Sequence, residues 1–351
     1  MTKFSSNDTA TQSLPMRLFR DAQDKRRAEK VEAELAQIEK GLAEHLDFAS
    51  PIADAAARYL LQAGGKRIRP VLTLLTADYG TGPNELVRQA AMAIELTHLA
   101  SLYHDDVMDD ARVRRGVASA QVVWSNSVAI LAGDLLFARA STLVSGMSED
   151  AILLQAKTFE RLCLGQLHET VGPAEGEDPI EHYLQVLADK TGALISTAAR
   201  FGAQFGNAPA ECLDAVTEYG ERIGIAFQLI DDVIDLSPKA EATGKKAGTD
   251  LRAGVVTLPM LLLQQRAETN ANDAALLDRI EAGVAAAADG THVEDLELAI
   301  AELRENDVTA ETERQARQWA ESAVRALDGL PNPSVTSALA RLAEAVVSRQ
   351  G

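Results

Sequence analysis

Two copies of one acidic pentad constrain this chain more than any other sequence feature. Asp-Asp-Val-Met-Asp occupies residues 105–109 and Asp-Asp-Val-Ile-Asp occupies 231–235, each at the end of a long apolar stretch. On a helix, side chains three and four positions apart share a face, so Asp105 and Asp106 direct their carboxylates toward Asp109. The second copy brings together Asp231, Asp232 and Asp235 in the same way. The chain must therefore place two carboxylate clusters at the ends of two largely buried helices.

Such clusters call for a cation. Three like charges within one turn repel and raise one another's pKa unless a cation lies among them. Hard carboxylate oxygens suit Mg²⁺, which completes its octahedron with waters and substrate phosphates. In a chain with 52 Asp and Glu against 34 Lys and Arg, one acidic run is easily explained as a solvated face. Two copies after apolar sequence, without alternating basic partners, favour metal binding instead, and two facing clusters would hold a polyphosphate.

Composition and periodicity predict an all-α fold. Aromatic residues make up only 4% of the chain while Ala and Leu dominate, which favours close helix packing over a β-sandwich. Helical periodicity recurs between breaks at Gly, Pro and Asn clusters, and no sustained period-two stretch is present. We expect a disordered segment at 1–14 and a single domain at 15–351, a bundle of antiparallel helices around a central cavity. The expected helices span 18–46, 51–63, 68–79, 84–112, 118–146, 150–170, 180–206, 209–236, 256–267, 273–288, 292–304, 309–327 and 334–349.

The same composition excludes several classes of protein. A net charge of −18 argues against a broad nucleic-acid interface, which needs a basic face. The N-terminus has no apolar signal segment, and the longest apolar passage, 128–138, is shorter than a membrane span and contains Asp134. Cys163 and Cys212 form no C-x-x-C pattern, which predicts free, buried thiols in a reducing cytoplasm. We expect a cytoplasmic protein without a membrane span.

Basic residues gather near glycines in two places. The segment Arg112-Val113-Arg114-Arg115-Gly116 follows the first pentad, where forked guanidinium groups would bind the phosphates that the metal holds. In Gly-Gly-Lys-Arg-Ile-Arg-Pro at 64–70, glycines allow close backbone approach to an anion and Lys66 and Arg69 supply charge. Neither this segment nor Gly244-Lys245 has the spacing of a nucleotide-binding P-loop.

Further polar residues complete the candidate set. Lys190-Thr191 lies in an apolar stretch, and Lys245 follows the second pentad. His98 precedes Asp105 by two helical turns on the same face, where it could donate to a phosphate, although a core histidine is the simpler reading. His104 beside Asp105 could instead begin a metal-dependent hydrolase site, but no other His shows matching ligand spacing.

These motifs resemble the trans-isoprenyl (polyprenyl) diphosphate synthases. Besides the two D-D-x-x-D motifs, the resemblance rests on Gly-Gly-Lys-Arg-Ile-Arg-Pro, Arg114-Arg115, Lys190-Thr191, Phe227-Gln228 and Gly248-Thr249-Asp250-Leu251, in this order between about residues 60 and 260. Class I terpene cyclases share the first motif but usually carry a different second one. The resemblance implies an isoprenoid synthase fold and a homodimer that joins isopentenyl diphosphate head-to-tail to an allylic diphosphate, namely dimethylallyl, geranyl, farnesyl or geranylgeranyl diphosphate.

The resemblance also assigns roles to residues. Both aspartate triads would bind Mg²⁺ that bridges the allylic diphosphate, and Arg114, Lys190 and Lys245 would hold this leaving group. Thr191 and Gln228 would stabilise the allylic cation. Isopentenyl diphosphate would be bound by Gly65, Lys66, Arg69, His98 and Arg115. The sequence departs from the family at Val255, where Lys is frequent, which removes one possible phosphate contact.

Physical chemistry supports this assignment, and product length is the softer inference. Breaking the C–O bond requires neutralisation of the departing diphosphate and a dry pocket that protects the cation. Ala100 and Ser101 are small and lie about one turn before Asp105, where short-chain family members carry large aromatics, so we expect a product longer than C15. A C35–C50 chain of the quinone-tail type is favoured, with C20 geranylgeranyl diphosphate as the alternative. Residues deeper in the tunnel that would decide between them include Ile94, Thr97 and Phe137.

Two other classes compete with the synthase. A metal-dependent phosphohydrolase built on His104 and Asp105 would release phosphate without an isopentenyl partner. A non-catalytic subunit of a heteromeric synthase would have no need of six clustered carboxylates, so the intact pentads argue against it.

Overall fold

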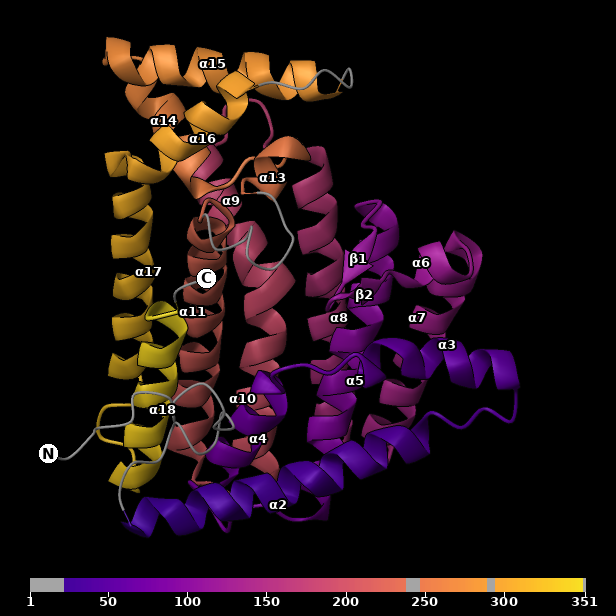
Figure 1. The fold of residues 1–351 in the computed structure, drawn as a ribbon. Coiled ribbons are helices and arrows are strands. Elements are labelled where there is room, and N and C mark those ends of the chain that lie inside the picture. Colours follow the sequence, from indigo (N-terminus) through magenta and orange to yellow (C-terminus); the bar gives the residue numbers. More distant parts are fainter. Residues whose placement is uncertain (1–21, 238–246, 289–293, 350–351) are drawn as a thin grey trace, which may run out of the picture. The chain divides into compact units, whose positions relative to one another are not determined.

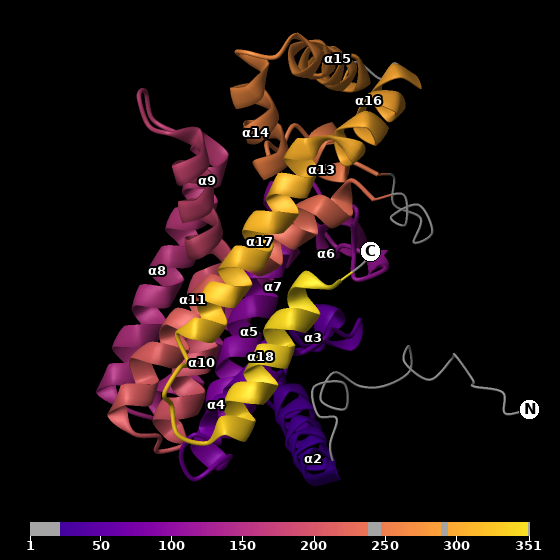
Figure 2. The ribbon, with the colours of Figure 1, turned by 90° about the vertical axis from the view of Figure 1, so that its left-hand side faces the viewer.

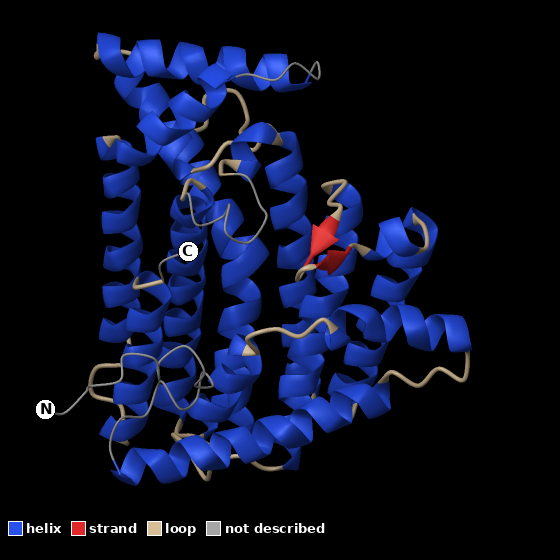
Figure 3. Ribbon diagram, viewed as in Figure 1, coloured by secondary structure: helices blue, strands red, loops and turns tan. Residues whose placement is uncertain are grey.

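The fold is almost wholly helical. The computed structural model describes residues 22–237, 247–288 and 294–349, and within them only two short strands interrupt the helices (Figure 3). The expectation of an all-α fold is confirmed. The predicted disorder at 1–14 lies outside the described residues.

The chain divides into two compact units. The first comprises 1–159, 194–217 and 327–341, and the second comprises 160–193, 218–326 and 342–351. The single domain expected over 15–351 stays a prediction, and each unit is described by itself. Helices α8, α10, α11 and α18 contribute residues to both units, and they span Glu149–Val171, Ala193–Phe205, Ala210–Asp235 and Pro333–Val347.

The first unit is built around α5 (Glu85–Met108), which packs most extensively against α7 (Asn126–Ser145). Asn84 caps α5 by accepting a hydrogen bond from the Val87 amide at 3.1 Å, and Glu85 complements the helix dipole. The remaining elements of this unit are α2 (Ala22–His45), α3 (Pro51–Gln62), α4 (Ile68–Ala77), α6 (Ala120–Val123) and the strands β1 (Val113–Arg114) and β2 (Val117–Ala118) (Figure 1).

Small residues let α7 approach α5 closely. A β-carbon at Gly133 of α7 would clash with the ring of His104 and lie 3.2 Å from the carbonyl oxygen of Ala100, both on α5. By length and composition alone, α7 is apolar enough to cross a membrane, although Asp134 interrupts it. The apolar helix at 126–145 is longer than the passage 128–138, and the absence of a membrane span stays a prediction.

The second unit has two hydrophobic clusters. One joins α9 (Pro179–Leu187), α11 and α14 (Leu258–Ala267) through Leu187, Leu229, Ile230 and Leu258. The other lies among α14, α15 (Ala271–Ala288) and α16 (Glu294–Glu305), which neighbour one another in Figures 1 and 2. The remaining elements are α17 (Asp307–Arg325), α13 (Thr249–Arg252) and the π-helical segment η1 (Ala188–Gly192).

Several expected boundaries were wrong. The helix expected over 84–112 ends at Met108, because Asp110 adopts φ 47° and the chain turns into the β1–β2 hairpin. The helix expected over 118–146 is interrupted at Trp124 and Ser125, and Ser125 caps α7. A short helix, α13, lies where only loop was expected. Cys212 is buried as predicted, but Cys163 is exposed on α8; both are free.

Candidate active site

The first acidic cluster lies at the end of α5, with Asp106 at its buried centre. The Asp106 side chain is fully buried, and its Oδ1 accepts a hydrogen bond from Arg114 Nε at 2.6 Å. Its Oδ2 is also buried and has no partner within the described part of the chain. Burial raises the pKa of Asp106, and Arg114 opposes that shift. Asp105 is half-buried, and exposed Asp109 caps the helix end.

The β1–β2 hairpin carries two arginines whose side chains bind different partners. Val113 pairs with Ala118 and Arg114 with Val117, so Arg115 (φ 53°) and Gly116 (φ 78°) form the tight turn. Positive φ at both central residues is the signature of a two-residue hairpin turn. Arg114 reaches back to Asp106, whereas Arg115 Nη1 donates to the carbonyl oxygens of Leu60, at 2.9 Å, and Gly64.

The glycine-rich loop between α3 and α4 lies against Arg115. Gly65 has φ 153°, and a β-carbon there would lie 3.1 Å from Arg115 Cζ, so only glycine fits. Arg67, in the left-handed region at φ 50°, forms ion pairs with Glu39 and, at 3.0 Å, with buried Glu95. Arg67 therefore braces the loop, while Lys66 is exposed.

Around this loop, the first unit contains buried positive charge that the nearby acidic side chains do not fully neutralise. Arg69 Nε is buried without a hydrogen-bond partner among the described residues, and burial lowers the pKa of Arg69 to about 10 despite nearby Glu95. Burial, followed by the charges of Arg69 and Arg115, holds the pKa of His98 well below its ordinary value. A buried donor without an acceptor and a neutral imidazole among guanidinium groups form a site suited to an anion.

The neighbouring residues of α5 face α7. His104 Nε2 lies 3.1 Å from the carbonyl oxygen of Ile130 and 3.4 Å from Asp134 Oδ1, so its ring is engaged away from a shared site with Asp105. Ala100 is fully buried and Ser101 half-buried, and Thr97 accepts a hydrogen bond from Gln155 at 2.8 Å. The rings of Phe137 and Phe159 contact each other at an interplanar angle of 55°, with centroids 4.3 Å apart.

The second acidic cluster lies on α11 in the second unit. Asp232 is only 6% exposed, and its Oδ2 accepts a hydrogen bond from the hydroxyl of Tyr183 at 2.7 Å. Burial raises the pKa of Asp232 to about 8, a shift to which the charges of Asp250 and Asp231 add. Asp235 Oδ2 accepts from the amide of Asp250 at 3.0 Å. The second cluster therefore has a fourth carboxylate beside it.

Arg349, after the end of α18, covers one edge of this cluster. Its Nη1 lies 2.9 Å from Asp231 Oδ1, and its guanidinium carbon lies 4.6 Å above the centre of the Phe227 ring. Gln228, the residue after Phe227, is half-buried.

Lys190 and Thr191 lie in η1, a π-helical segment inside the helix expected over 180–206. Such segments frequently occur at functional sites. Three glycines allow backbones to approach here: a β-carbon at Gly224 would lie 2.6 Å from Gly192 Cα, and one at Gly165 would lie 2.7 Å from the Lys190 amide. Lys190 forms an ion pair with Glu169 on α8, and Thr191 is buried.

The structure thus brings the predicted residues into two sets. Gly65, Arg69, His98, Arg114 and Arg115 gather in the first unit with the first triad, and Lys190 and Thr191 share the second unit with the second triad. Lys245 lies outside the described residues. Sequence reasoning missed Glu95, Glu169, Tyr183 and Arg349 as partners of the site. Asp250 was visible in the Gly-Thr-Asp-Leu motif but was given no role.

The carboxylates fit a hard divalent cation. Within the described ranges no three His, Cys, Asp or Glu side chains already converge as ligands. The buried, unpaired Oδ2 of Asp106 and the crowded charges of Asp231, Asp232 and Asp250 are nevertheless oxygen donors that a cation would satisfy.

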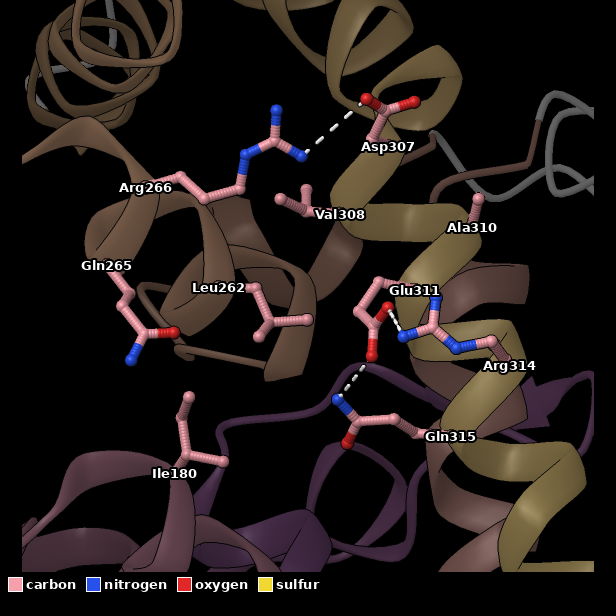
Figure 4. A pocket seen from close by; sticks show the side chains of 10 residues that line it. All are labelled: Ile180, Leu262, Gln265, Arg266, Asp307, Val308, Ala310, Glu311, Arg314 and Gln315. Carbon is pink, nitrogen blue, oxygen red and sulfur yellow. Dashed lines mark hydrogen bonds and ion pairs between the residues drawn. The ribbon is translucent and has the colours of Figure 1, made fainter. Parts of the chain in front are cut away.

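One pocket of the second unit is not built from these residues. It has a volume of about 640 Å³ and lies among α9, α14 and α17 of the second unit (Figure 4). Its charged side chains pair with each other, as Arg314 does with Glu311 and as Arg266 does with Asp307 at 3.8 Å. None of the predicted site residues lines it, so it carries no catalytic assignment.

An all-α fold with two aspartate-rich helices, a buried cationic cluster and a π-helical Lys-Thr segment defines the class of isoprenyl diphosphate synthases. The chain belongs to the polyprenyl synthetase family, whose model matches residues 50–294. This confirms the family and the trans-prenyltransferase class expected from the motifs.

Individual relatives agree. The chain is 41% identical over 325 residues to the nonaprenyl diphosphate synthase of Mycobacterium tuberculosis, which covers 92% of this chain and 94% of that protein. It is 35% identical over 300 residues to heptaprenyl diphosphate synthase component 2 of Geobacillus stearothermophilus, covering 85% and 90%. The crystal structure of a polyprenyl synthase from Caulobacter crescentus, complexed with calcium and isoprenyl diphosphate, matches with a TM-score of 0.83 at 30% identity, covering 97% and 99%.

Proposed function

We propose that this protein is a Mg²⁺-dependent synthase that extends an allylic diphosphate with isopentenyl diphosphate to a long all-trans polyprenyl diphosphate. The observation that carries this proposal is on α5. This helix carries His98, within a buried cationic cluster that needs no metal, and two turns later the carboxylates of Asp105 and Asp106. One helix would thus contribute to two diphosphate sites, one without metal and one with metal. A condensation requires two such sites, whereas a hydrolysis requires only one.

The cationic cluster would bind isopentenyl diphosphate. Arg69 brings an unsatisfied buried donor, Arg115 and Lys66 bring further charge, and Gly65 keeps the backbone clear of Arg115. His98, held neutral by burial and the guanidinium groups, can donate one hydrogen bond to a phosphate oxygen. Binding in this cluster would hold the alkene of the second substrate close to the reacting carbon.

The aspartate triads would hold the metal, and the lysines would bind the leaving group. Asp105, Asp106 and Asp109 with Asp231, Asp232 and Asp235 offer only oxygen donors, which suits Mg²⁺. Bound there, the metal would neutralise charge that develops on the departing diphosphate. Arg114, Lys190 and Lys245 would share that charge, and Lys190 would exchange its pairing with Glu169 for a phosphate oxygen.

The reaction then balances without a further base on the protein. The allylic C–O bond breaks, and the terminal alkene carbon of isopentenyl diphosphate forms the new C–C bond. The C2 methylene beside the resulting tertiary cation then loses a proton, which restores a double bond. Thr191 and Gln228 would stabilise the allylic cation with their oxygen dipoles while burial excludes water. The released diphosphate would accept the proton.

The relatives' names support a long product, a C35–C50 chain. The nonaprenyl and heptaprenyl synthases are long-chain enzymes by name, and fully buried Ala100 leaves no aromatic floor at that position. A C20 geranylgeranyl product remains the alternative, because Ile94, Thr97 and Phe137 would set the deeper end. Mass analysis of prenyl products from wild type and Ala100→Phe tests this: the variant should make a shorter chain, and unchanged lengths would contradict the assignment.

The assembly proposed is a cytoplasmic homodimer. In the first unit the exposed apolar side chains Val122, Val123, Ile130 and Leu131 lie on α6 and α7, and Leu131 is 60% exposed. Such a patch needs a partner surface. The relative named as component 2 belongs to a multicomponent enzyme by its name, so a second protein is the alternative partner.

The decisive experiment incubates purified protein with Mg²⁺, isopentenyl diphosphate and farnesyl diphosphate and follows prenyl products. Longer diphosphates are expected from this chain alone. Phosphate release without isopentenyl diphosphate, abolished by His104→Ala, would point to the hydrolase instead. Absence of product with every allylic primer would contradict the proposal, and activity restored only by a second protein would identify a subunit.

A further inference from the structure

In each acidic triad the second aspartate, Asp106 or Asp232, is the buried one. One oxygen of each accepts a hydrogen bond, and the donor differs between the two. Asp106 is held by the cationic Arg114 at 2.6 Å, whereas Asp232 is held by the neutral hydroxyl of Tyr183 at 2.7 Å. A guanidinium group offsets the charge of the carboxylate it binds, and a phenol leaves that charge available to a metal.

Tyr183 is fixed where it can orient Asp232. It lies on α9, and its ring packs against the hydrophobic cluster that contains Leu229 and Ile230 of α11 and Leu258 of α14. Leu229 lies three residues before Asp232, on the same face of α11, so the Tyr183 ring packs close to the carboxylate that its hydroxyl binds. The hydroxyl donates to Oδ2, and the backbone amide of Leu258 also donates to the Asp232 carboxylate.

The carboxylate needs this support because its neighbours repel it. Asp231 and Asp250 both act on Asp232 with like charge. The Tyr183 hydroxyl and the Leu258 amide oppose this repulsion, and Tyr183 is the side chain of the two donors that a substitution can remove. Groups that orient metal ligands in this way typically change metal affinity 10- to 100-fold when removed.

We propose that Tyr183 is a positioning residue of the second carboxylate cluster, which fixes Asp232 for a divalent metal bound with diphosphate. This inference rests on the proposed function, because it takes Asp232 as a metal ligand. Tyr183 touches neither substrate nor the reacting atoms in this role. It acts through the carboxylate alone.

The test compares Tyr183→Phe with wild type by calorimetric titration of Mg²⁺ in the presence of inorganic diphosphate. Removing only the hydroxyl should weaken metal binding by roughly 10-fold or more. In prenyl transfer the Mg²⁺ concentration for half-maximal rate should rise by a similar factor, and saturating Mg²⁺ should restore most of the rate. Tyr79→Phe is the matched control, because the hydroxyl of buried Tyr79 shares a hydrogen bond with the Thr336 hydroxyl at 2.8 Å and touches no predicted site residue.

The outcomes separate this inference from the proposed function. Wild-type binding by Tyr183→Phe together with loss of binding by Asp232→Asn would overturn the role of Tyr183 and leave the metal cluster standing. Unchanged metal binding by Asp232→Asn would overturn the metal cluster itself. A rate in Tyr183→Phe that no Mg²⁺ concentration restores would indicate a purely structural role and would also count against the inference.

Discussion

At the scale of single residues, the site places ionisable groups in surroundings that are electrostatically unfavourable. Arg69, His98 and Asp232 are each buried in surroundings that oppose their charged form, as the directions of their pKa shifts record. Folding alone would not favour such groups. Shifts of pKa in these directions are typical of a site that binds charged ligands.

Arg69→Met should separate binding from stability. The variant loses a buried charge that burial and Arg115 disfavour, so the free energy of unfolding without ligand should rise. The KM for isopentenyl diphosphate should rise by roughly 10- to 100-fold, as expected when a charged hydrogen bond is lost. Thermal denaturation and steady-state kinetics measure both. Arg26→Met, at an exposed residue of α2, should change neither.

Asp232 should make the metal-free protein less stable as pH rises. Its pKa is raised from 3.8 to about 8, so between those values the folded chain keeps a proton that the unfolded chain has lost. The free energy of unfolding must then fall with increasing pH across that window. Urea denaturation at pH 5, 6.5 and 8 should show a shallower pH dependence for Asp232→Asn than for wild type. Asp214→Asn, at an exposed position, should keep the wild-type slope, and equal slopes for all three proteins would refute this.

At the scale of elements, close approach between backbones positions the residues of the predicted site. The π-helical segment η1 carries Lys190 and Thr191, and Gly165 of α8 and Gly224 of α11 make room for it. The β1–β2 hairpin does the same for Arg114 and Arg115 by turning at Gly116.

Gly224→Ala should disturb η1 directly. The added methyl group would lie 2.6 Å from Gly192 Cα, where backbone and not a flexible side chain must shift. We expect a loss of about 1–3 kcal/mol in stability, typical of overpacking, and a lower kcat. Gly146→Ala is the control, because its nearest atom lies 3.8 Å away. Full activity of Gly224→Ala would show that the Lys190 backbone tolerates displacement.

The end of α18 should compete with metal at the second cluster. Arg349→Ala removes the cation that pairs with Asp231, so less Mg²⁺ should be needed for half-maximal activity, by roughly twofold to fivefold for a partly exposed ion pair. Metal titration of prenyl transfer measures this effect. Arg325→Ala breaks an exposed pair with Glu321 instead and should leave the titration unchanged. A requirement for more Mg²⁺ in Arg349→Ala would reverse the role given to Arg349.

At the scale of the whole molecule, the chain divides its chemistry between two compact units. The first carries one carboxylate triad with the cationic cluster, and the second carries the other triad with the Lys-Thr segment. The proposed reaction uses both units. The prenyl-transfer assay therefore reports the effect of a site substitution in either unit.

The proposed homodimer should depend on the apolar patch of α6 and α7. Leu131→Glu places a charge on a 60% exposed apolar residue of that patch and should shift the protein from dimer to monomer in sedimentation velocity. Leu298→Glu, at a 64% exposed position on α16, serves as the matched control. Dissociation by Leu298→Glu and not by Leu131→Glu would place the interface elsewhere.

The sequence by itself determined the fold class, the family and the class of reaction. Helical periodicity is local, and the pentads name their ligand chemistry through residue type and spacing alone. The hairpin at 113–118 escaped prediction because strands of two residues leave no period-two pattern. The π-helical segment at 188–192, Ala-Asp-Lys-Thr-Gly, escaped it because its residue pattern does not differ from that of an ordinary helix.

Only the tertiary structure decided which charges are buried and what holds them. Nothing near Asp232 in sequence names Tyr183, and nothing near Asp231 names Arg349, because both partners reach α11 from other helices. The same holds for Glu95 beside Arg67 and for His104, which α7 engages through Ile130 and Asp134. Burial and long-range pairing are properties of packed helices, so they appear only once the helices are placed.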